Sequence, residues 1–305
     1  MKRDPLTLSV IGCGLIGRSW TALFLANGHD VRAWDPDADV RASLPSQLTL
    51  PREQLLSLGK GQRPGRLMVA DTLGEAVAGA DFIQENAPEN VPVKHALYAQ
   101  IEVFCPAEAI LSSSTSAFTW SDLSVGMRHP ARFITAHPFN PPHLIPLIEL
   151  FGIDADVLDR AENFYRGLGS SPVRLKKDAV GHIANRLASA LWREAVNIVA
   201  EGIADVSDVD RALVDGPGLR WSVVGAHMCY HLGGGEGGIA HYLQQLGPSQ
   251  ERRWKTLGDP RLTPEVCERL VAGIAAEADG RTIPELEADR DARLIDALKA
   301  RSAHV

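Results

Sequence analysis

Signals of secreted or membrane-spanning proteins are missing from this sequence. Its four cysteines, Cys13, Cys105, Cys229 and Cys267, lie far apart and form neither a CxxC motif nor the spacing of a disulfide framework. No run of about 18 apolar residues occurs, so no membrane span is predicted. Residues 1–5 lead directly into a strand-like segment, without the apolar core of a signal peptide. We therefore expect a protein of the reducing cytoplasm.

Positive charge is also scarce. With 31 lysines and arginines against 38 acidic residues, the chain has a net charge of −7 and no basic stripe, so nucleic acid is not an expected partner. No cluster of histidines, cysteines and carboxylates has metal-ligand spacing, which argues against a metal site and zinc-dependent chemistry. What remains is an ordinary globular composition, 45% hydrophobic and 23% charged, over 305 residues, a length that suits about two domains.

Short apolar runs alternate with helical stretches as far as residue 178. Residues 6–11 form an apolar run that stops at Gly12, as a buried parallel strand would. A helix is predicted next over 15–27, followed by Gly28 and with an apolar side made of Leu15, Ile16, Trp20, Leu23 and Phe24. Residues 37–58 are predicted to be helical, with interruptions at Pro45 and Pro51. Further strands are predicted over 30–35, 66–70, 81–85, 109–113, 132–136, 147–151 and 173–175. This alternation is typical of a doubly wound α/β sheet.

The pattern changes after Asp178. One long amphipathic helix is predicted over 181–202, and residues 205–301 are helical with glycine-rich interruptions and no convincing strand. In 285–299, charges of both signs surround a few apolar residues, which is typical of a solvated helix with one buried face. We therefore predict an α/β domain over 1–180 and an all-α domain over 181–305.

A glycine-rich turn joins the first predicted strand to the first predicted helix. Its sequence, Gly12-Cys13-Gly14-Leu15-Ile16-Gly17, has the GxGxxG pattern. In such a turn the first glycine allows the tight bend, the second lets the backbone approach a pyrophosphate, and the third lets helix and strand pack closely. The pyrophosphate would lie at the positive N-terminus of the helix, beside Leu15 and Ile16. The alternative is a turn without a ligand, but the flanking strand and helix favour a dinucleotide site.

An acidic residue follows the second predicted strand. Asp35 is at the position where a carboxylate accepts hydrogen bonds from the adenosine ribose hydroxyls and repels a 2′-phosphate, so NAD is the expected cofactor. Arg32 and Arg41 are near enough to leave some use of NADP open. Cys13, between the glycines, is interpreted as a small filler without a redox role.

A histidine and a carboxylate lie on neighbouring predicted strands. His137 begins the segment His-Pro-Phe-Asn-Pro, and Glu149 follows in the next strand. A carboxylate can fix the tautomer of an imidazole, whose other nitrogen then takes a proton from a hydroxyl. Together with a hydride acceptor, this pair would oxidise a secondary alcohol. The alternative is a core histidine and an unrelated carboxylate.

These segments resemble the 3-hydroxyacyl-CoA dehydrogenase family over nearly the whole chain. The resemblance rests on the GxGxxG turn, the serine-rich segment 113–116, the segment 137–141 with Glu149, and Gly-His-Ile-Ala-Asn-Arg at 181–186. It implies a Rossmann-like N-terminal domain and an all-α C-terminal dimerisation domain of the 6-phosphogluconate-dehydrogenase type. A homodimer is therefore expected from the resemblance and not from the composition.

The resemblance also implies roles for site residues. His137 would be the general base, oriented and polarised by Glu149. Ser116 would hydrogen-bond the substrate oxygen, and Asn185 would help to hold that oxygen and the transition state. The bottom-up logic agrees for Ser116, since a hydroxyl can stabilise a developing alkoxide.

In the segment 85–94, Glu85, Glu89 and Lys94 match a family stretch beside the cofactor; Glu89 and Lys94 are expected at the cofactor site, with Lys94 as the direct contact. The chain also departs from the family pattern, which has Asn at Ser114, Pro at Val180 and Phe at His182. Ser114 keeps a hydroxyl for the nicotinamide ribose. His182 is interpreted as a helix-start residue rather than a cavity residue, and His143 as part of a loop.

The sequence of the second predicted domain narrows the range of possible substrates. Its segments 216–222, 232–238, 247–248 and 282–286 look most like the carnitine 3-dehydrogenase branch, which acts on free 3-hydroxy acids. Lambda-crystallin, the L-gulonate 3-dehydrogenase, is a more distant relative. Residues 37–66, where the acyl-CoA enzymes bind CoA, contain few lysines and are broken by prolines, which argues against a CoA thioester.

Polar and aromatic residues of that domain are candidates for substrate binding. Arg220 is a candidate carboxylate clamp, because guanidinium matches carboxylate bidentately. Trp221, Tyr230 and Glu236 are candidates to enclose the quaternary ammonium of carnitine. An equally good interpretation is that the two aromatic side chains pack between the subunits of a dimer. L-Gulonate, a short hydroxyacyl-CoA and a cyclic imine reduced in the opposite direction stay open as substrates. So does a crystallin-like structural protein, which would have no need of a base–carboxylate pair.

Overall fold

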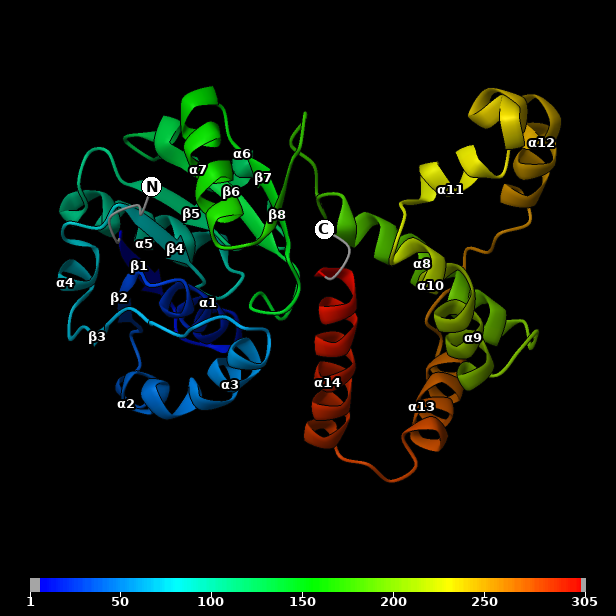
Figure 1. Ribbon diagram of the computed structural model, residues 1–305, viewed down its shortest axis with the longest axis horizontal. Helices are drawn as coiled ribbons and strands as arrows, with labels where there is room; N and C mark the ends of the chain where they lie inside the picture. The colour runs from blue at the N-terminus through cyan, green and yellow to red at the C-terminus, as the bar shows by residue number, and fades with distance from the viewer. Residues whose placement is uncertain (1–5, 303–305) are drawn as a thin grey trace. The chain divides into compact units, whose positions relative to one another are not determined.

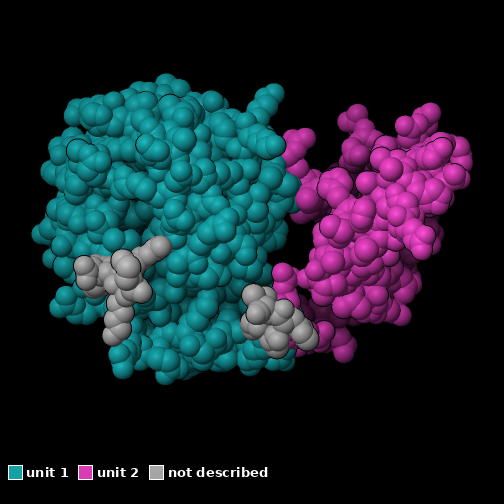
Figure 2. All heavy atoms as spheres, turned by 45° about the horizontal axis from the view of Figure 1, so that its top comes forward, with its two compact units in different colours: residues 1–185, 294–299 teal, residues 186–293, 300–305 magenta. Residues whose placement is uncertain are grey.

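The chain forms two compact units. The computed structural model describes residues 6–302; residues 1–5, for which no signal peptide is expected, and 303–305 lie outside the described part. Unit 1 comprises residues 1–185 and 294–299, and unit 2 comprises residues 186–293 and 300–305 (Figure 2). Within 6–302, no helix has the length and apolar character needed to cross a membrane. The same residues contain no group of three or more histidines, cysteines and carboxylates that would hold a metal ion.

Unit 1 is built on one eight-stranded sheet with the order β3-β2-β1-β4-β5-β6-β7-β8 (Figure 1). Neighbouring strands run parallel except β6 and β7, which are antiparallel. The strands are β1 (Thr7–Ile11), β2 (Asp30–Trp34), β3 (Leu67–Val69), β4 (Phe82–Glu85), β5 (Ile110–Ser113), β6 (Phe133–Pro138), β7 (Leu147–Phe151) and β8 (Ser171–Arg174). Each predicted strand is present, and the last begins before the predicted 173–175.

Helices cover both faces of this sheet, and each face has its own apolar core. One core gathers Trp20, Leu55 and Tyr165, from α1, α3 and α7. The other gathers Val77, Ile101 and Leu123, from α4, α5 and α6. The helical elements are α1 (Leu15–Ala26), α2 (Ala38–Gln47), α3 (Thr49–Ser57), α4 (Leu73–Val77), α5 (Val91–Phe104), α6 (Trp120–Leu123), the 3-10 turn η1 (Pro130–Arg132) and α7 (Ala155–Gly167). Burial on both faces explains why the strands read as apolar runs.

Two details of the predicted helices are wrong. Leu15 was assigned to an apolar side of α1, yet its side chain is 49% exposed, because it begins the helix beside the glycine turn. The prolines do not interrupt 37–58 where predicted: Pro45 lies inside α2, and the break falls at Leu48. Pro51 lies in the first turn of α3, where a missing N–H costs no helical hydrogen bond.

The regular elements of unit 2 in the described residues are all helical, as predicted; α8 begins just before this unit, and residues 294–299 of α14 belong to unit 1. The elements are α8 (Ala184–Ala200), α9 (Val206–Leu213), the π-helical turn η2 (Val214–Gly218), α10 (Leu219–Trp221), α11 (Ala226–Leu232), the 3-10 turn η3 (Gly235–Gly237), α12 (Gly238–Trp254), α13 (Pro264–Ala278) and α14 (Ile283–Ser302). The predicted fold class, an α/β part followed by an all-α part, is therefore confirmed, and the boundary at residue 180 stays a prediction.

Candidate active site

His137 and Glu149 face each other across the one antiparallel pair of strands. They are direct register partners in β6 and β7, and side chains of such partners emerge on the same face of a sheet. The Nδ1 of His137 lies 2.8 Å from Glu149 Oε2, and both side chains are buried. Because an ionised carboxylate only accepts, Nδ1 carries the hydrogen and Nε2 is left to take a proton. The structure thus brings together the two residues of the predicted acid–base pair.

The second oxygen of Glu149 is held by backbone at the start of α8. Its Oε1 accepts hydrogen bonds from the N–H groups of Ile183 at 2.7 Å and Ala184 at 2.9 Å. Burial alone would raise the pKa of Glu149, but the hydrogen bonds from His137, Ala184 and Ile183 outweigh it and hold the pKa below its ordinary value of 4.5. The carboxylate therefore stays charged beside the imidazole.

A cavity of about 440 Å³ opens beside His137 within unit 1. From the predicted cofactor set it is lined by Ile16, Glu89, Lys94 and Ser114, and from the predicted catalytic set by Ser116, His137 and Asn185. It also includes residues of the singled-out segments 85–94 and 137–141 to which the sequence assigned no individual role: Asn86, Pro88, Phe139 and Asn140. Asn86 directly follows β4, and ligands of parallel sheets bind at the carboxyl ends of strands, so its position after a predicted strand was the available signal.

The glycine turn has the backbone that a dinucleotide needs. Gly12 has φ +86°, and a Cβ at Gly17 would lie 1.8 Å from the carbonyl oxygen of Gly12, so neither position tolerates a side chain. Gly14 has open space in place of a Cβ. In the described chain no side chain caps the N-terminus of α1, so its first N–H groups are available to an anion. These residues fit the pyrophosphate of NAD.

Asp35 supports this turn from the end of β2. Its Oδ2 accepts a hydrogen bond from the N–H of Cys13 at 2.8 Å. Burial, reinforced by Asp35, raises the pKa of the Cys13 thiol to about 12, so this cysteine is chemically quiet. The two arginines that left NADP open donate to main-chain carbonyls, Arg41 to that of Asp35 and Arg32 to that of Ala78.

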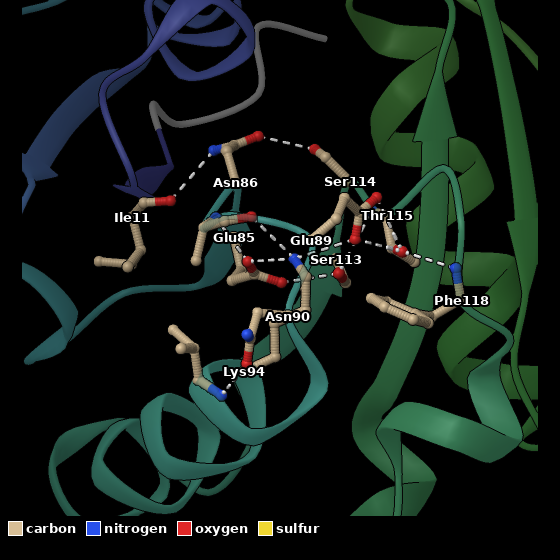
Figure 3. Close-up of polar contacts among 12 residues, drawn as sticks. Ile11, Glu85, Asn86, Glu89, Asn90, Lys94, Ser113, Ser114, Thr115 and Phe118 are labelled. Carbon is tan, nitrogen blue, oxygen red and sulfur yellow. Dashed lines mark hydrogen bonds and ion pairs between the residues drawn. The ribbon is translucent and has the colours of Figure 1, made fainter.

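Lys94, expected to contact the cofactor directly, belongs to a buried ion pair. Its Nζ donates to Glu85 Oε1 at 2.7 Å, and both side chains are at most 1% exposed (Figure 3). Tyr98 and Ser113 each donate a hydroxyl to Glu85 Oε2 at 2.6 Å. Burial, and then the Glu85 charge, raise the pKa of Tyr98 well above its ordinary value, so it stays a donor. Lys94 lines the cavity from this anchored position, and a direct contact with NAD stays a prediction.

The serine-rich segment after β5 is tied to the loop after β4 (Figure 3). Glu89 accepts from the N–H of Ser116 at 2.6 Å, from its hydroxyl at 3.2 Å and from the hydroxyl of Thr115 at 2.9 Å. Ser114 donates its hydroxyl to Asn86 Oδ1 at 2.7 Å. The two serines therefore line the cavity with hydroxyls that already have partners, and their roles toward substrate and cofactor stay predictions.

Two further histidines of unit 1 are buried, His143 and His182. His143, which sequence reasoning left as a loop residue, pairs through Nδ1 with the hydroxyl of Ser19 at 2.7 Å and through Nε2 with Gln54 at 2.6 Å, and so ties its loop to α1 and α3. His182 stacks on the ring of His137, with centroids 4.7 Å apart. The interpretation of His182 as only a helix-start residue is thus incomplete.

The candidate substrate residues belong to unit 2, where all four are exposed. Arg220 and Trp221 lie in α10, Tyr230 lies in α11 and Glu236 lies in η3. Tyr230 packs against Tyr242 of the same unit with ring centroids 5.1 Å apart, and its packing between subunits stays a prediction. The four are not among the residues that line the cavity beside His137, and their role stays a prediction.

A nucleotide-binding sheet with this glycine turn, together with a histidine–carboxylate pair in the adjoining cavity, defines an NAD-dependent oxidoreductase that acts on CH–OH groups. The chain belongs to the 3-hydroxyacyl-CoA dehydrogenase family. The model of the family's NAD binding domain matches residues 7–179, and that of its C-terminal domain matches residues 181–271.

Individual proteins that are similar to this chain over most of its length have more specific names than the family. The chain is 43% identical over 299 residues to an L-carnitine dehydrogenase of Nocardiopsis dassonvillei, covering 96% of this chain and 91% of the relative. It is 43% identical over 302 residues to an L-carnitine dehydrogenase of Streptomyces griseus, covering 97% and 90%. Among solved structures, FHMPC 5-dehydrogenase, an NAD+ dependent dismutase, is similar with a TM-score of 0.83 and 26% identity, covering 97% of this chain and 98% of that one.

Proposed function

We propose that the protein oxidises the 3-hydroxyl of a free L-3-hydroxy acid to the 3-oxo acid, with L-carnitine as the best single substrate. The chemistry is carried by one observation, the 2.8 Å contact between His137 Nδ1 and Glu149 Oε2 beside the cavity. The choice of carnitine is supported by the relatives named above. The absence of a lysine-rich surface in residues 37–66 argues against a CoA thioester.

In this proposal His137 is the general base. Glu149 keeps the hydrogen on Nδ1, so Nε2 accepts the proton of the substrate hydroxyl, and the charged carboxylate stabilises the imidazolium that forms. Ser116 and Asn185, which line the same cavity, hold the substrate oxygen. Bound NAD supplies the hydride acceptor.

The cofactor would be held by the turn and the strand ends of unit 1. Gly12, Gly14 and Gly17 leave room for the pyrophosphate, and Leu15 and Ile16 present the first N–H groups of α1 to it. Asp35 favours the adenosine ribose of NAD over a 2′-phosphate. Glu89, Lys94 and Ser114 line the cavity on the nicotinamide side of this proposal.

In this proposal, residues of unit 2 bind the two charged groups of carnitine, its carboxylate and its quaternary ammonium. Arg220 would pair with the carboxylate, and Trp221, Tyr230 and Glu236 would enclose the quaternary ammonium by cation–π contact and charge. We further propose a homodimer through the helical domain, in a reducing cytoplasm. Exposed apolar side chains in unit 2, among them Leu187, Trp192 and Val271, support the dimer.

Turnover tests this proposal directly. Formation of reduced NAD is followed at alkaline pH with L-carnitine, L-gulonate, L-3-hydroxybutyrate and its CoA thioester side by side. We expect carnitine to have the highest kcat/KM and His137→Gln to abolish turnover while NAD binding persists. His129→Gln, which changes an exposed histidine, is the matched control. Retained turnover in His137→Gln would refute the base assignment, and no turnover of any of the four would refute the choice of substrate.

A further inference from the structure

His182 lies face to face with the proposed base. Its imidazole stacks on that of His137 with ring centroids 4.7 Å apart and an angle of 21° between the planes. The side chain is only 3% exposed, and its Nδ1 has no hydrogen-bond partner among the described residues. A buried polar atom without a partner is rare in folded proteins, so its presence here calls for a physical explanation.

The backbone around His182 is shaped to deliver this stack. Gly181 has φ +74° and His182 has φ +49°, so two consecutive residues adopt left-handed conformations. The next two residues, Ile183 and Ala184, donate their N–H groups to Glu149. Residues 181–184 therefore make two contacts with the acid–base pair. Their backbone N–H groups bind the carboxylate of Glu149, and the side chain of His182 covers the imidazole of His137.

His182 combines three energetically unfavourable features, one of its backbone and two of its side chain. A residue other than glycine is strained at positive φ, Nδ1 loses its hydration without a new partner, and the ring is buried in a form that resists protonation. Burial lowers the pKa of His182 below its ordinary value of 6.5, His137 lowers it further, and the charges of Glu149, Asp178 and Glu89 act in the opposite direction. Phenylalanine, the residue of the family pattern, would avoid the last two features.

We propose that His182 is a positioning residue for His137, holding the plane of its ring while Glu149 holds its Nδ1; this rests on the proposed role of His137 as the base. Because burial, and then His137, hold the pKa of His182 below its ordinary value, its ring covers His137 at neutral pH without adding a charge beside the base.

The test compares two substitutions of His182 with an exposed control. His182→Phe keeps a flat ring and removes the titrating group, and His182→Ala removes the stack. We expect His182→Ala to lower kcat by about tenfold or more, since small misplacements of a catalytic group are costly, without raising KM for NAD. His182→Phe should restore most of kcat at alkaline pH. Val180→Ala, an exposed change in the same segment, should behave as the unmodified protein.

The split between kcat and KM separates positioning from mere packing. Lost orientation of the base should lower kcat in His182→Ala while KM for NAD and for the substrate changes little, and the ring of His182→Phe should rescue kcat. By nuclear magnetic resonance, the Nδ1–H proton of His137, which is hydrogen-bonded to Glu149, should exchange with water faster in His182→Ala than in the unmodified protein or in His182→Phe.

The proton-exchange measurement needs no substrate turnover. If His182→Ala does not fold, His182→Asn, which tolerates a left-handed backbone, takes its place. Full kcat, or unchanged exchange of the Nδ1–H proton, in a folded variant that lacks the stack would overturn the positioning role. By contrast, turnover by His137→Gln would overturn the proposed function and would leave the exchange result intact.

Discussion

Lys94 Nζ lies 2.7 Å from Glu85 Oε1, and the two side chains form an ion pair that is closed off from solvent. The pair ties the first turn of α5 to the end of β4, the strand end that precedes the cavity-lining Asn86. Two charges removed from water stabilise a fold only while both are present, so this pair is sensitive to the loss of either partner.

Lys94→Met should lower the free energy of unfolding by about 3–5 kcal/mol, because it leaves the charge of Glu85 buried without its partner. Urea unfolding followed by circular dichroism measures this. The double variant Lys94→Met with Glu85→Gln is the control and should recover much of the loss. Equal destabilisation in the single and double variants would show that packing, and not charge, dominates.

Glu149→Gln should reduce kcat by up to about 10⁴-fold, the loss found when the carboxylate of a serine-protease triad becomes an amide and the wrong imidazole tautomer is favoured. KM for NAD should change little, since Glu149 is remote in sequence and contact from the glycine turn. Steady-state kinetics measure both constants. The exposed Glu53→Gln is the matched control. A loss of less than tenfold would contradict the orienting role.

Acid should destabilise the fold partly through Glu149. Its pKa in the folded protein lies below the ordinary 4.5, so the unfolded chain binds the proton more tightly. The resulting stabilisation is fully present above 4.5 and is lost as pH falls through the lower folded value. Unfolding free energies measured from neutral pH downward should therefore fall less steeply in Glu149→Gln. Parallel curves for the two proteins would rule out this contribution.

Two glycines of the cofactor turn should respond differently to alanine. Gly17→Ala should prevent correct folding, because its Cβ would lie 1.8 Å from the carbonyl oxygen of Gly12. Gly14→Ala has open space and should fold normally, yet bind NAD more weakly because the methyl group occupies the approach of the pyrophosphate. Thermal unfolding and NAD titration by fluorescence measure the two effects. A Gly14→Ala protein with full NAD affinity would argue against this turn as the pyrophosphate site.

Asp35→Asn should weaken the preference for NAD. The carboxylate is the acceptor proposed for the ribose hydroxyls, and loss of a hydrogen bond to a charged group costs about 1.5–3 kcal/mol, which is about tenfold or more in kcat/KM. The ratio of kcat/KM for NAD to that for NADP is the quantity to measure. An unchanged ratio would mean that other residues select the cofactor.

The strands could be predicted because a sheet covered on both faces favours mainly apolar runs, as in residues 6–11 and 147–151. The residues at which helices begin and end were harder to predict from the sequence. The break at Leu48 was missed because proline is tolerated in the first turn of a helix, as at Pro51.

The site was predictable where residue type and spacing carry the chemistry, as for His137 and Glu149. It was not predictable where partners are chosen by packing. Nothing in the spacing of Lys94 reveals that Glu85 takes its ammonium, and the stack of His182 on His137 depends on two left-handed residues and on a long-range approach. These relationships arise only when the chain is folded.

The antiparallel ladder between β6 and β7 has a consequence for how this active site can diverge. Strand register fixes His137 opposite Glu149, and a slip of one residue within either strand would send one side chain to the opposite face. The connection over residues 139–146 lies outside that ladder, yet its first residues, Phe139 and Asn140, line the cavity. Substitutions in this connection, whether natural or engineered, can therefore change the shape of the cavity while His137 and Glu149 stay in place.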